Sequence, residues 1–557
     1  MLLLASAHTA YASYDVSINN DPVKLDYNTG VAEAIGDTVY LPVRKLAEAN
    51  GGSVGWSDGC TTVTAGENVT KLWGGQAFAH VNGTQVWLSH PIRIDDGHTM
   101  ISIEDTSVIG LYKDITQPWS GVNLHRKFYG ASDRFFNIVT TISGDPHTTR
   151  AFAWEAMPEY RDMVIEYGVR GSGVLWRGTA AYTESAVSFA YNTIAGVSQR
   201  IYNAEYVSEM ENMLFYKAEL TSLVPGTTYS YRVGDPVRGE WSEFFTFTTE
   251  AENTNEFSVI GVTDPQGRTR GEYSYYRKTL YTALSDDPNA AFVINMGDLT
   301  DNANYDDWWR YFFEAGIGIQ ERLPQITVVG NHENRGAGAK YYNLRFMNPK
   351  NGSGLASWYV SDGNDKRSWP IIQNLDNTVY SFDYGNAHFS VLNTGTDWSA
   401  LEMRTMLEWQ RDWLDSDLSS TDKEWKIVLV HIGVYLQKPR ESLVKAIFED
   451  TIDRHGVDLV LEGHDHTYMR TFQMRAGAAV SDERMYYKKG GGALYAILGS
   501  AALKRYNSDT PQPYAAVMRN IPDEEPSYTI LSFDPAKISV ISKLTDGSVI
   551  DEFSIWK

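Results

Sequence analysis

From about residue 256 onward in this 557-residue chain, short apolar runs end abruptly in polar residues, and helical stretches separate the runs. Alternating strands and helices predict an α/β domain, and open α/β sheets bind ligands at the carboxyl edge of their strands. We therefore expect the polar residues to gather at such an edge. The five runs end in Asp264, in Gly297-Asp298, in Gly330-Asn331-His332-Glu333, in His431 and in Gly463-His464-Asp465-His466.

The residue types at these strand ends suit a pair of metal ions. Two cations held close together need a shared carboxylate and further oxygen or imidazole donors. Sites built from several thiolates are excluded because Cys60 is the only cysteine. Glycines precede Asp298, Asn331 and His464, which suits tight strand exits where the backbone passes close to a ligand.

Each motif also has a simpler interpretation when it is taken alone. An Asp after a strand is usually a turn or a helix cap, an Asn-His pair is usually a loop, and His431 would be a satisfied core histidine. Five such motifs in one order, with His464 and His466 forming a His-x-His pair, favour the metal site. We expect Asp465 to support its loop or the ligands, and His388 to belong to a strand core.

The chain is longer than one hydrophobic core supports, so we expect about three domains. Residues 13–115 carry a weak repeat, in which a turn and short strand at 36–43 recur at 97–103, and a helix is expected at 43–50; these features predict a small α+β module. In residues 136–250, short strands and a turn at Pro225-Gly226 predict an all-β sandwich with a corner closed by a tyrosine. Residues 256–557 form the α/β domain.

Composition limits the partners. A formal net charge of −22 and a pI near 5.0 argue against a nucleic-acid scaffold, which requires a basic surface. No apolar run reaches the roughly eighteen residues that a membrane-spanning helix needs. Residues 1–12 are apolar and end in Ala10-Tyr11-Ala12, a pattern that suits signal-peptidase cleavage before Ser13. They are either the remnant of a signal peptide, which implies a secreted or cell-surface protein, or a frayed terminus.

From Phe136 onward, the order and neighbours of these motifs resemble the calcineurin-like metallophosphoesterase superfamily, in its purple acid phosphatase branch. Further matching segments are 379–385, 388–393, 463–470 and 546–553. The resemblance implies a fibronectin type III-like sandwich followed by a catalytic domain in which two sheets are flanked by helices. Residues 13–115 resemble the accessory module at the N-terminus of bacterial copper amine oxidases. That resemblance implies a positioning or wall-associated module and no copper.

The resemblance also implies roles for the site residues. Asp298 would bridge two metal ions, and His332 would contact the phosphate and protonate the leaving oxygen. The two ions would be iron, manganese, zinc or calcium. Asp264 and His466 would hold one ion, while Asn331, His431 and His464 would hold the other.

Three departures from the family pattern affect these expectations. Asp301 stands where the purple branch has a tyrosine, so the protein should not be purple. Gln266 replaces a histidine of the wider superfamily and would coordinate through its carbonyl oxygen, through water, or not at all; an oxygen-rich site favours hard ions over zinc. The chain also lacks the histidine pair that follows the fourth motif. Arg335 and Arg470 are therefore candidate substrate contacts, whereas Lys438 and Arg440 are more simply solvated surface charges.

We expect hydrolysis of a phosphate monoester by a metal-bridging hydroxide. The alternative is a phosphodiesterase that acts on nucleotides or cell-wall phosphodiesters. A third possibility is a surface-binding protein with a catalytically weak relic domain, which Gln266 together with Asp301 would favour.

Overall fold

The computed structural model describes residues 15–18, 21–23, 33–35, 38–49, 51–65, 68–88, 90–95, 97–102, 106, 109, 111–113, 121–126, 135–190, 208–334, 339–352, 377–395, 400–437, 443–506, 511–522 and 525–557. The expected signal-peptide remnant at 1–12 lies outside them. The chain divides into two compact units, Met1–Tyr129 and Gly130–Lys557. Within the described part, no helix is long and apolar enough to span a membrane.

The described residues of the first unit form three small sheets and one helix, α1 (Val43–Ala49). The two copies of the weak repeat become β4 (Thr38–Pro42) and β11 (His98–Ser102), which pair antiparallel with Leu41 opposite Ile101. Their sheet also contains β10 (Arg93–Asp95) and β3 (Glu33–Ile35). The second sheet has the order β12 (Leu111–Lys113), β13 (Gly121–Arg126), β1 (Asp15–Ile18), β2 (Asp21–Val23). The third sheet has the order β5 (Ser53–Ser57), β6 (Cys60–Ala65), β7 (Asn68–Trp73), β8 (Phe78–Val81), β9 (Thr84–Trp87).

The second unit begins with the expected β-sandwich. One sheet has the order β14 (Phe135–Thr141), β15 (Arg150–Ala156), β19 (Ser208–Leu220), β18 (Ala181–Ala190). The other has the order β17 (Trp176–Gly178), β16 (Val164–Val169), β20 (Thr228–Asp235), β21 (Glu240–Trp241), and β22 (Phe245–Thr248) also pairs with β20. The buried rings of Trp154 and Tyr216 stack in the core at 5.3 Å. At the predicted corner, the Val224 amide donates to the Tyr229 hydroxyl oxygen at 2.9 Å.

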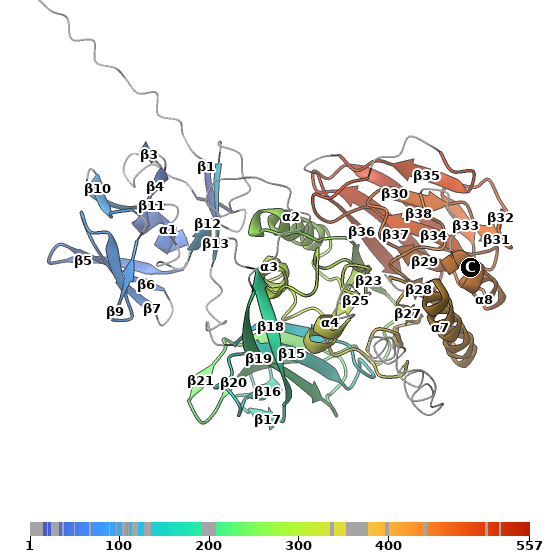
Figure 1. Cartoon of the computed structure of the whole chain (residues 1–557), viewed down its shortest axis with the longest axis horizontal. Coiled ribbons are helices and arrows are strands. Elements are labelled where there is room, and N and C mark those ends of the chain that lie inside the picture. Colours follow the sequence, from blue (N-terminus) through green and yellow to red (C-terminus); the bar gives the residue numbers. More distant parts are fainter. Residues whose placement is uncertain are drawn as a thin grey trace, which may run out of the picture. The chain divides into compact units, whose positions relative to one another are not determined.

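The α/β part of the second unit consists of two seven-stranded sheets that enclose one apolar core (Figure 1). The first has the order β25 (Gln325–Thr327), β24 (Val293–Asn295), β23 (Phe257–Val262), β36 (Ser527–Phe533), β37 (Lys537–Leu544), β38 (Val549–Trp556), β33 (Tyr486–Lys488). The second has the order β26 (Tyr380–Tyr384), β27 (Ala387–Val391), β28 (Trp425–Leu429), β29 (Leu459–Glu462), β34 (Leu494–Leu498), β30 (Tyr468–Thr471), β35 (Ala515–Arg519). A hairpin of β31 (Met474–Arg475) and β32 (Ala478–Ala479) is separate from both.

Helices cover the outer faces of both sheets, as the expected architecture requires. On the first sheet, α2 (Arg270–Asp286) and α3 (Asp306–Ala315) bury aromatic residues such as Tyr276 and Phe312, which stack at 5.4 Å. A capping box at Thr269 begins α2. On the second sheet, α7 (Ala400–Ser420) and α8 (Leu443–Arg454) bury leucines and isoleucines against β28 and β29. The short helix α4 (Lys340–Arg345) lies next to the sandwich strand β15.

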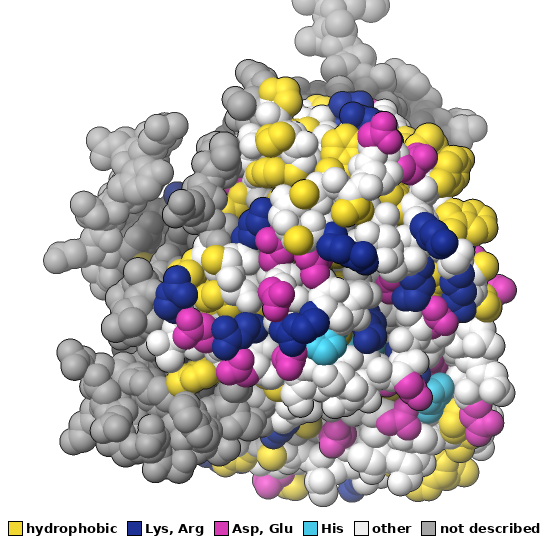
Figure 2. All heavy atoms as spheres, turned by 90° about the vertical axis from the view of Figure 1, so that its right-hand side faces the viewer, with side chains coloured by type: hydrophobic (Ala, Val, Ile, Leu, Met, Phe, Trp, Pro, Cys, Tyr) yellow, Lys and Arg dark blue, Asp and Glu magenta, His cyan; other side chains and the backbone are white. Residues whose placement is uncertain are grey.

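Parallel pairing brings the strand ends of both sheets to the same region. In the first sheet β23, β24 and β25 are parallel, and in the second β27, β28, β29 and β34 are parallel. Because each predicted motif directly follows one of these strands, the fold directs the motifs toward a common place. On the face of the molecule drawn in Figure 2, Lys and Arg side chains are interspersed with Asp and Glu. This mixture is what solubility alone requires.

Candidate metal centre

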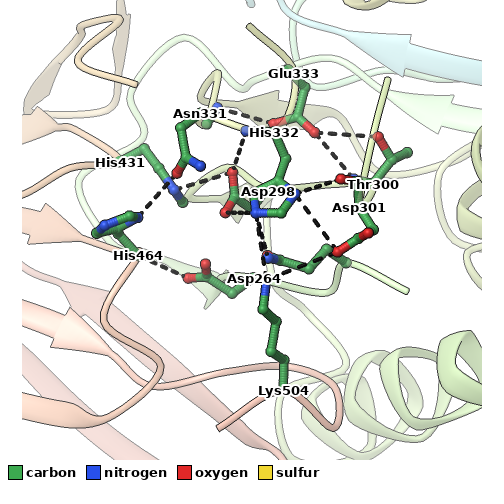
Figure 3. Close-up of polar contacts among 12 residues, drawn as sticks. Asp264, Asp298, Thr300, Asp301, Asn331, His332, Glu333, His431, His464 and Lys504 are labelled. Atoms are coloured by element: carbon green, nitrogen blue, oxygen red, sulfur yellow. Dashed lines mark hydrogen bonds and ion pairs between the residues drawn. The ribbon is translucent and has the colours of Figure 1, made fainter. Parts of the chain in front are cut away.

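Two groups of ligand-type side chains meet where the two sheets converge (Figure 3). One group consists of Asp298, His431 and His464, and the other of Asp264, Asp298 and His466; within each group the donor atoms lie within 4.8 Å of one another. Asp298 belongs to both groups. A carboxylate shared by two donor sets is the arrangement that a pair of cations needs.

In the first group, a backbone carbonyl orients His431 and a side-chain oxygen contacts His464. His431 lies 3.2 Å from Asp298 through Nε2, while its Nδ1 lies 2.7 Å from the carbonyl oxygen of Met296. A carbonyl only accepts, so Nδ1 carries a hydrogen, and Nε2 is the ring atom that faces the cluster. The Nδ1 atom of His464 lies 3.0 Å from the side-chain oxygen of Asn331.

The second group is built around Asp264. Its Oδ1 lies 3.0 Å from His466 Nε2, and its Oδ2 accepts hydrogen bonds from the hydroxyl of Thr263 at 2.5 Å and from the amide of His464 at 2.9 Å. These contacts hold one carboxylate oxygen in place and leave the other directed at the cluster.

Buried donor atoms without hydrogen-bond partners show that this cluster fits cations. They include Asp264 Oδ1, Gln266 Oε1 and His431 Nε2. A buried polar atom left unpaired costs about 1–3 kcal/mol, so such atoms are uncommon unless a ligand satisfies them. Three in one cluster, all of types that bind metals, match the donor set of a dinuclear site.

Electrostatics keeps the shared carboxylate ionised. Burial raises the pKa of Asp298, but the nearby His431 and His332 outweigh burial and hold this pKa well below its usual range. Burial also lowers the pKa of His431, yet the charge of Asp298 outweighs it and raises the pKa to about 9. For His464, burial and then the charge of His431 lower the pKa to about 4, which favours the neutral imidazole that metals require.

The residues that carry ligands adopt a strained backbone. Asp264, Asp298, His464 and His466 have φ angles of +52°, +53°, +71° and +47°, in the left-handed region that non-glycine residues rarely adopt. A glycine is also required before Asn331, as expected for a tight strand exit. A Cβ atom on Gly330 would lie only 2.1 Å from Asp298 Oδ1, so no side chain fits there.

His332 lies at the edge of the cluster, and all of its polar atoms are engaged. Its amide donates to Asp298 Oδ1 at 3.0 Å, and its Nδ1 lies 2.5 Å from the carbonyl oxygen of Asp301. Because that carbonyl only accepts, Nδ1 carries a hydrogen. Its Nε2 then faces the side-chain amide of Gln266 at 3.2 Å and the ammonium of Lys504 at 3.4 Å.

Asp301, the residue that the sequence places at the family tyrosine position, belongs to neither ligand group. Its Oδ2 lies 2.7 Å from Arg268 Nε, and its Oδ1 lies 3.9 Å from Lys504 Nζ. Neither Arg268 nor Lys504 was predicted from the sequence. The position of Lys504 could have indicated a role, because this residue follows the apolar run of β34, a strand parallel to β29. That run ends in Gly499-Ser500-Ala501, however, and none of these residue types is a usual metal ligand.

The predicted substrate contact at Arg470 is wrong. Its side chain is fully buried, and its guanidinium binds Asp551 at 2.6 Å through Nε and also contacts the Tyr487 hydroxyl. It therefore links β30 of one sheet to β38 of the other. Arg335, Lys438 and Arg440 lie outside the described residues.

Two other predicted roles concern supporting residues. Asp465 accepts from the amide of Gln437 at 2.6 Å and so holds the loop after His431. His388 is buried on β27, between Asp383 and Asp417.

Comparisons with known proteins agree with this fold and site. Residues 257–468 match the calcineurin-like phosphoesterase family, residues 136–249 the purple acid phosphatase N-terminal domain, and residues 17–110 the copper amine oxidase N-terminal domain. The chain therefore contains a purple acid phosphatase N-terminal domain followed by a calcineurin-like phosphoesterase domain. Proteins of this kind are hydrolases that use a dinuclear metal centre.

Individual relatives are distant. Acid phosphatase type 7 from Homo sapiens is 26% identical over 381 residues, which cover 62% of this chain and 77% of that protein. Probable inactive purple acid phosphatase 1 from Arabidopsis thaliana is 24% identical over 427 residues, covering 71% and 64%. The structure of purple acid phosphatase PPD1 from yellow lupin (Lupinus luteus) seeds has a TM-score of 0.58 at 18% identity, covers 78% of this chain and 76% of that one, and shows the shared fold.

Proposed function

We propose that this protein hydrolyses phosphate monoesters at a centre of two metal ions. The observation that carries the proposal is the sharing of Asp298 by two groups of donor residues, all buried except the half-buried His464. Similarity alone does not establish activity, because the Arabidopsis relative is named a probable inactive purple acid phosphatase. The argument for activity therefore depends on the residues of this chain. Here both donor groups are present together.

The residues would divide between the two ions as follows. Asp264, Gln266 and His466 would hold one ion, and Asn331, His431 and His464 the other, with Asp298 between them. When bound, the ions activate water and neutralise charge that develops on the phosphoryl group. Gln266 is included because its buried Oε1 has no hydrogen-bond partner, while its amide nitrogen already faces His332.

His332 is placed to serve the leaving oxygen. The Asp301 carbonyl engages Nδ1, so the atom turned toward the cluster is Nε2, 3.6 Å from Asp298 Oδ2. A proton donated to the leaving group would therefore come from Nε2, which has to be protonated for that step. General-acid catalysis of this kind contributes about 10²- to 10⁴-fold to the rate.

The proposal is tested by stripping the metal from the protein and restoring manganese, iron, zinc or calcium one at a time. Activity is measured on 4-nitrophenyl phosphate and on bis(4-nitrophenyl) phosphate. We expect metal to restore hydrolysis, with the monoester preferred, and Asp298→Asn to lower it by more than about a hundredfold because both ions lose a ligand. Asp286→Asn, which changes a surface aspartate paired with Lys543, is the matched control.

Each contrary outcome has its own meaning. Faster turnover of the diester would replace the monoesterase by a phosphodiesterase. If the protein binds fewer than two ions per chain and hydrolyses neither ester, the remaining hypothesis is a surface-binding protein with a catalytically weak domain.

We also propose that the protein acts outside the cell and that the unit Met1–Tyr129 associates with the cell wall. The support is the small-x-small pattern at Ala10-Tyr11-Ala12 and the match of residues 17–110 to an accessory domain. Fractionation of the producing cells into cytosol, wall and medium tests both points. Recovery of the protein in the cytosol alone would reject them.

A further inference from the structure

Lys504 brings a positive charge to the site that none of the metal ligands supplies. Its Nζ lies 3.4 Å from His332 Nε2, and Figure 3 shows the side chain extending toward the cluster from the opposite side to Glu333. The Lys504 side chain is 31% exposed, whereas that of His332 is 7% exposed. Lys504 thus connects the buried cluster with solvent, where a substrate enters.

The loop that carries Lys504 is fixed to the strand that carries a ligand. The Ala501 amide donates to the carbonyl oxygen of Thr263 at 2.7 Å, and the Ser500 hydroxyl donates to that of Asp264 at 3.3 Å. From α2, the Thr279 hydroxyl donates to the carbonyl oxygen of Ala501 at 2.8 Å. A charged group on such a braced loop keeps its position relative to the ligands, as substrate-binding groups require.

The present partner of Lys504 holds it weakly. Asp301 is 3.9 Å away, and its other oxygen lies only 2.7 Å from Arg268. A long ion pair at a partly exposed position contributes little, so an incoming anion can replace it. Lysine acts as a point charge toward phosphate, and its attraction grows with the charge of the anion.

We propose that Lys504 binds the phosphoryl group of the substrate and favours dianionic monoesters over monoanionic diesters. The inference rests on the proposed function and deepens it. Lys504 would thereby supply a substrate contact in a chain that lacks the histidine pair expected after His431.

The test compares Lys504→Met and Lys504→Arg with Lys278→Met. Lys278 is a matched control, because it pairs with Glu525 at 3.0 Å and its side chain is 40% exposed. With protein reconstituted with Mn²⁺, kcat and KM are measured for 4-nitrophenyl phosphate and its diester, and the affinity for inorganic phosphate is measured by calorimetry. For Lys504→Met we expect kcat/KM to fall about tenfold on the monoester and less than about threefold on the diester, with phosphate binding weakened about tenfold. Lys504→Arg should recover part of each loss.

Equal losses on the two esters with unchanged phosphate affinity would overturn the proposal, because they would show that Lys504 only positions His332 or Asp301. Unchanged kinetics would overturn it as well. If the wild-type protein hydrolyses neither ester, the proposed function fails, and the phosphate affinities of wild type and Lys504→Met still decide whether Lys504 binds the anion.

Discussion

Gln266 is the residue whose chemistry most affects how tightly one of the metal ions would be held. Its buried Oε1 lacks a hydrogen-bond partner, but an amide oxygen is neutral and binds cations less strongly than a carboxylate. We expect Gln266→Ala to weaken one of two binding events by about tenfold and to spare the other. Metal content after dialysis against a weak chelator checks this.

The control for Gln266→Ala is Gln320→Ala, which removes another buried amide, one that donates to the carbonyl oxygen of Phe313. Two ions retained equally by Gln266→Ala and wild type would mean that Gln266 is not a ligand.

At the residue scale, the sequence predicted the clustering of the candidate ligands better than it predicted substrate contacts. The ligands directly follow apolar strands, so position and residue type give the same answer, and the structure brings Asp264, Asp298, His431, His464 and His466 together. Nothing local distinguishes a cation that faces substrate from one that faces the core. Arg470 was therefore assigned wrongly, and Lys504 was found only from its place beside His332.

At the scale of single elements, His388 links β27 to the turn end of β26 and to α7. Burial lowers its pKa, but hydrogen bonds to Asp383 at 2.7 Å and Asp417 at 2.9 Å outweigh burial and raise the pKa to about 9. A histidine whose folded-state pKa exceeds its unfolded value stabilises the protein fully below about pH 6.5, and this contribution is lost as the pH rises through 9.

Replacing His388 by glutamine should consequently lower stability by roughly 2–3 kcal/mol at pH 6, and the deficit should shrink by pH 10. Thermal melting of wild type and variant across this pH range measures the deficit. Ser390→Ala is the control, because it removes a neutral hydrogen bond to the same Asp417 and should act equally at each pH. A deficit for His388→Gln that is constant with pH would show that this histidine is uncharged in the folded protein.

At the scale of the whole molecule, buried charges join the sandwich to the catalytic part of the second unit. Arg345 of α4 lies 2.9 Å from Glu155 of β15 and also pairs with Asp306 of α3, and its side chain is 1% exposed. Arg345→Met would leave the buried Glu155 without its cation, while Asp306 would keep Arg310 at 2.8 Å; breaking a buried pair in this way costs about 3–5 kcal/mol. We expect a lower melting temperature with both parts still unfolding together.

Differential scanning calorimetry measures the melting temperatures of wild type and Arg345→Met. Arg404→Met is the control, because Arg404 pairs with Glu408 on an exposed helical face. If the sandwich and the catalytic part melt separately already in the wild type, the pair does not couple them.

The order of folded segments was predictable from the sequence, whereas this junction was not. Strand and turn signals act over a few residues, so the tyrosine corner at Tyr229 and the two repeated strands, β4 and β11, could be expected, although the pairing of β4 with β11 could not. Glu155 and Arg345 are 190 positions apart, and only the assembled fold brings them into contact.

The left-handed backbone conformation of four candidate ligands makes thermal stability and function compete. The four residues are Asp264, Asp298, His464 and His466. Each such residue costs roughly 1 kcal/mol that glycine would not, so glycine there would relieve strain and leave the buried pocket less charged. Directed evolution for thermal tolerance alone would accept those glycines and discard the ligands with them. Improvement of this protein therefore has to select for turnover and melting temperature at the same time.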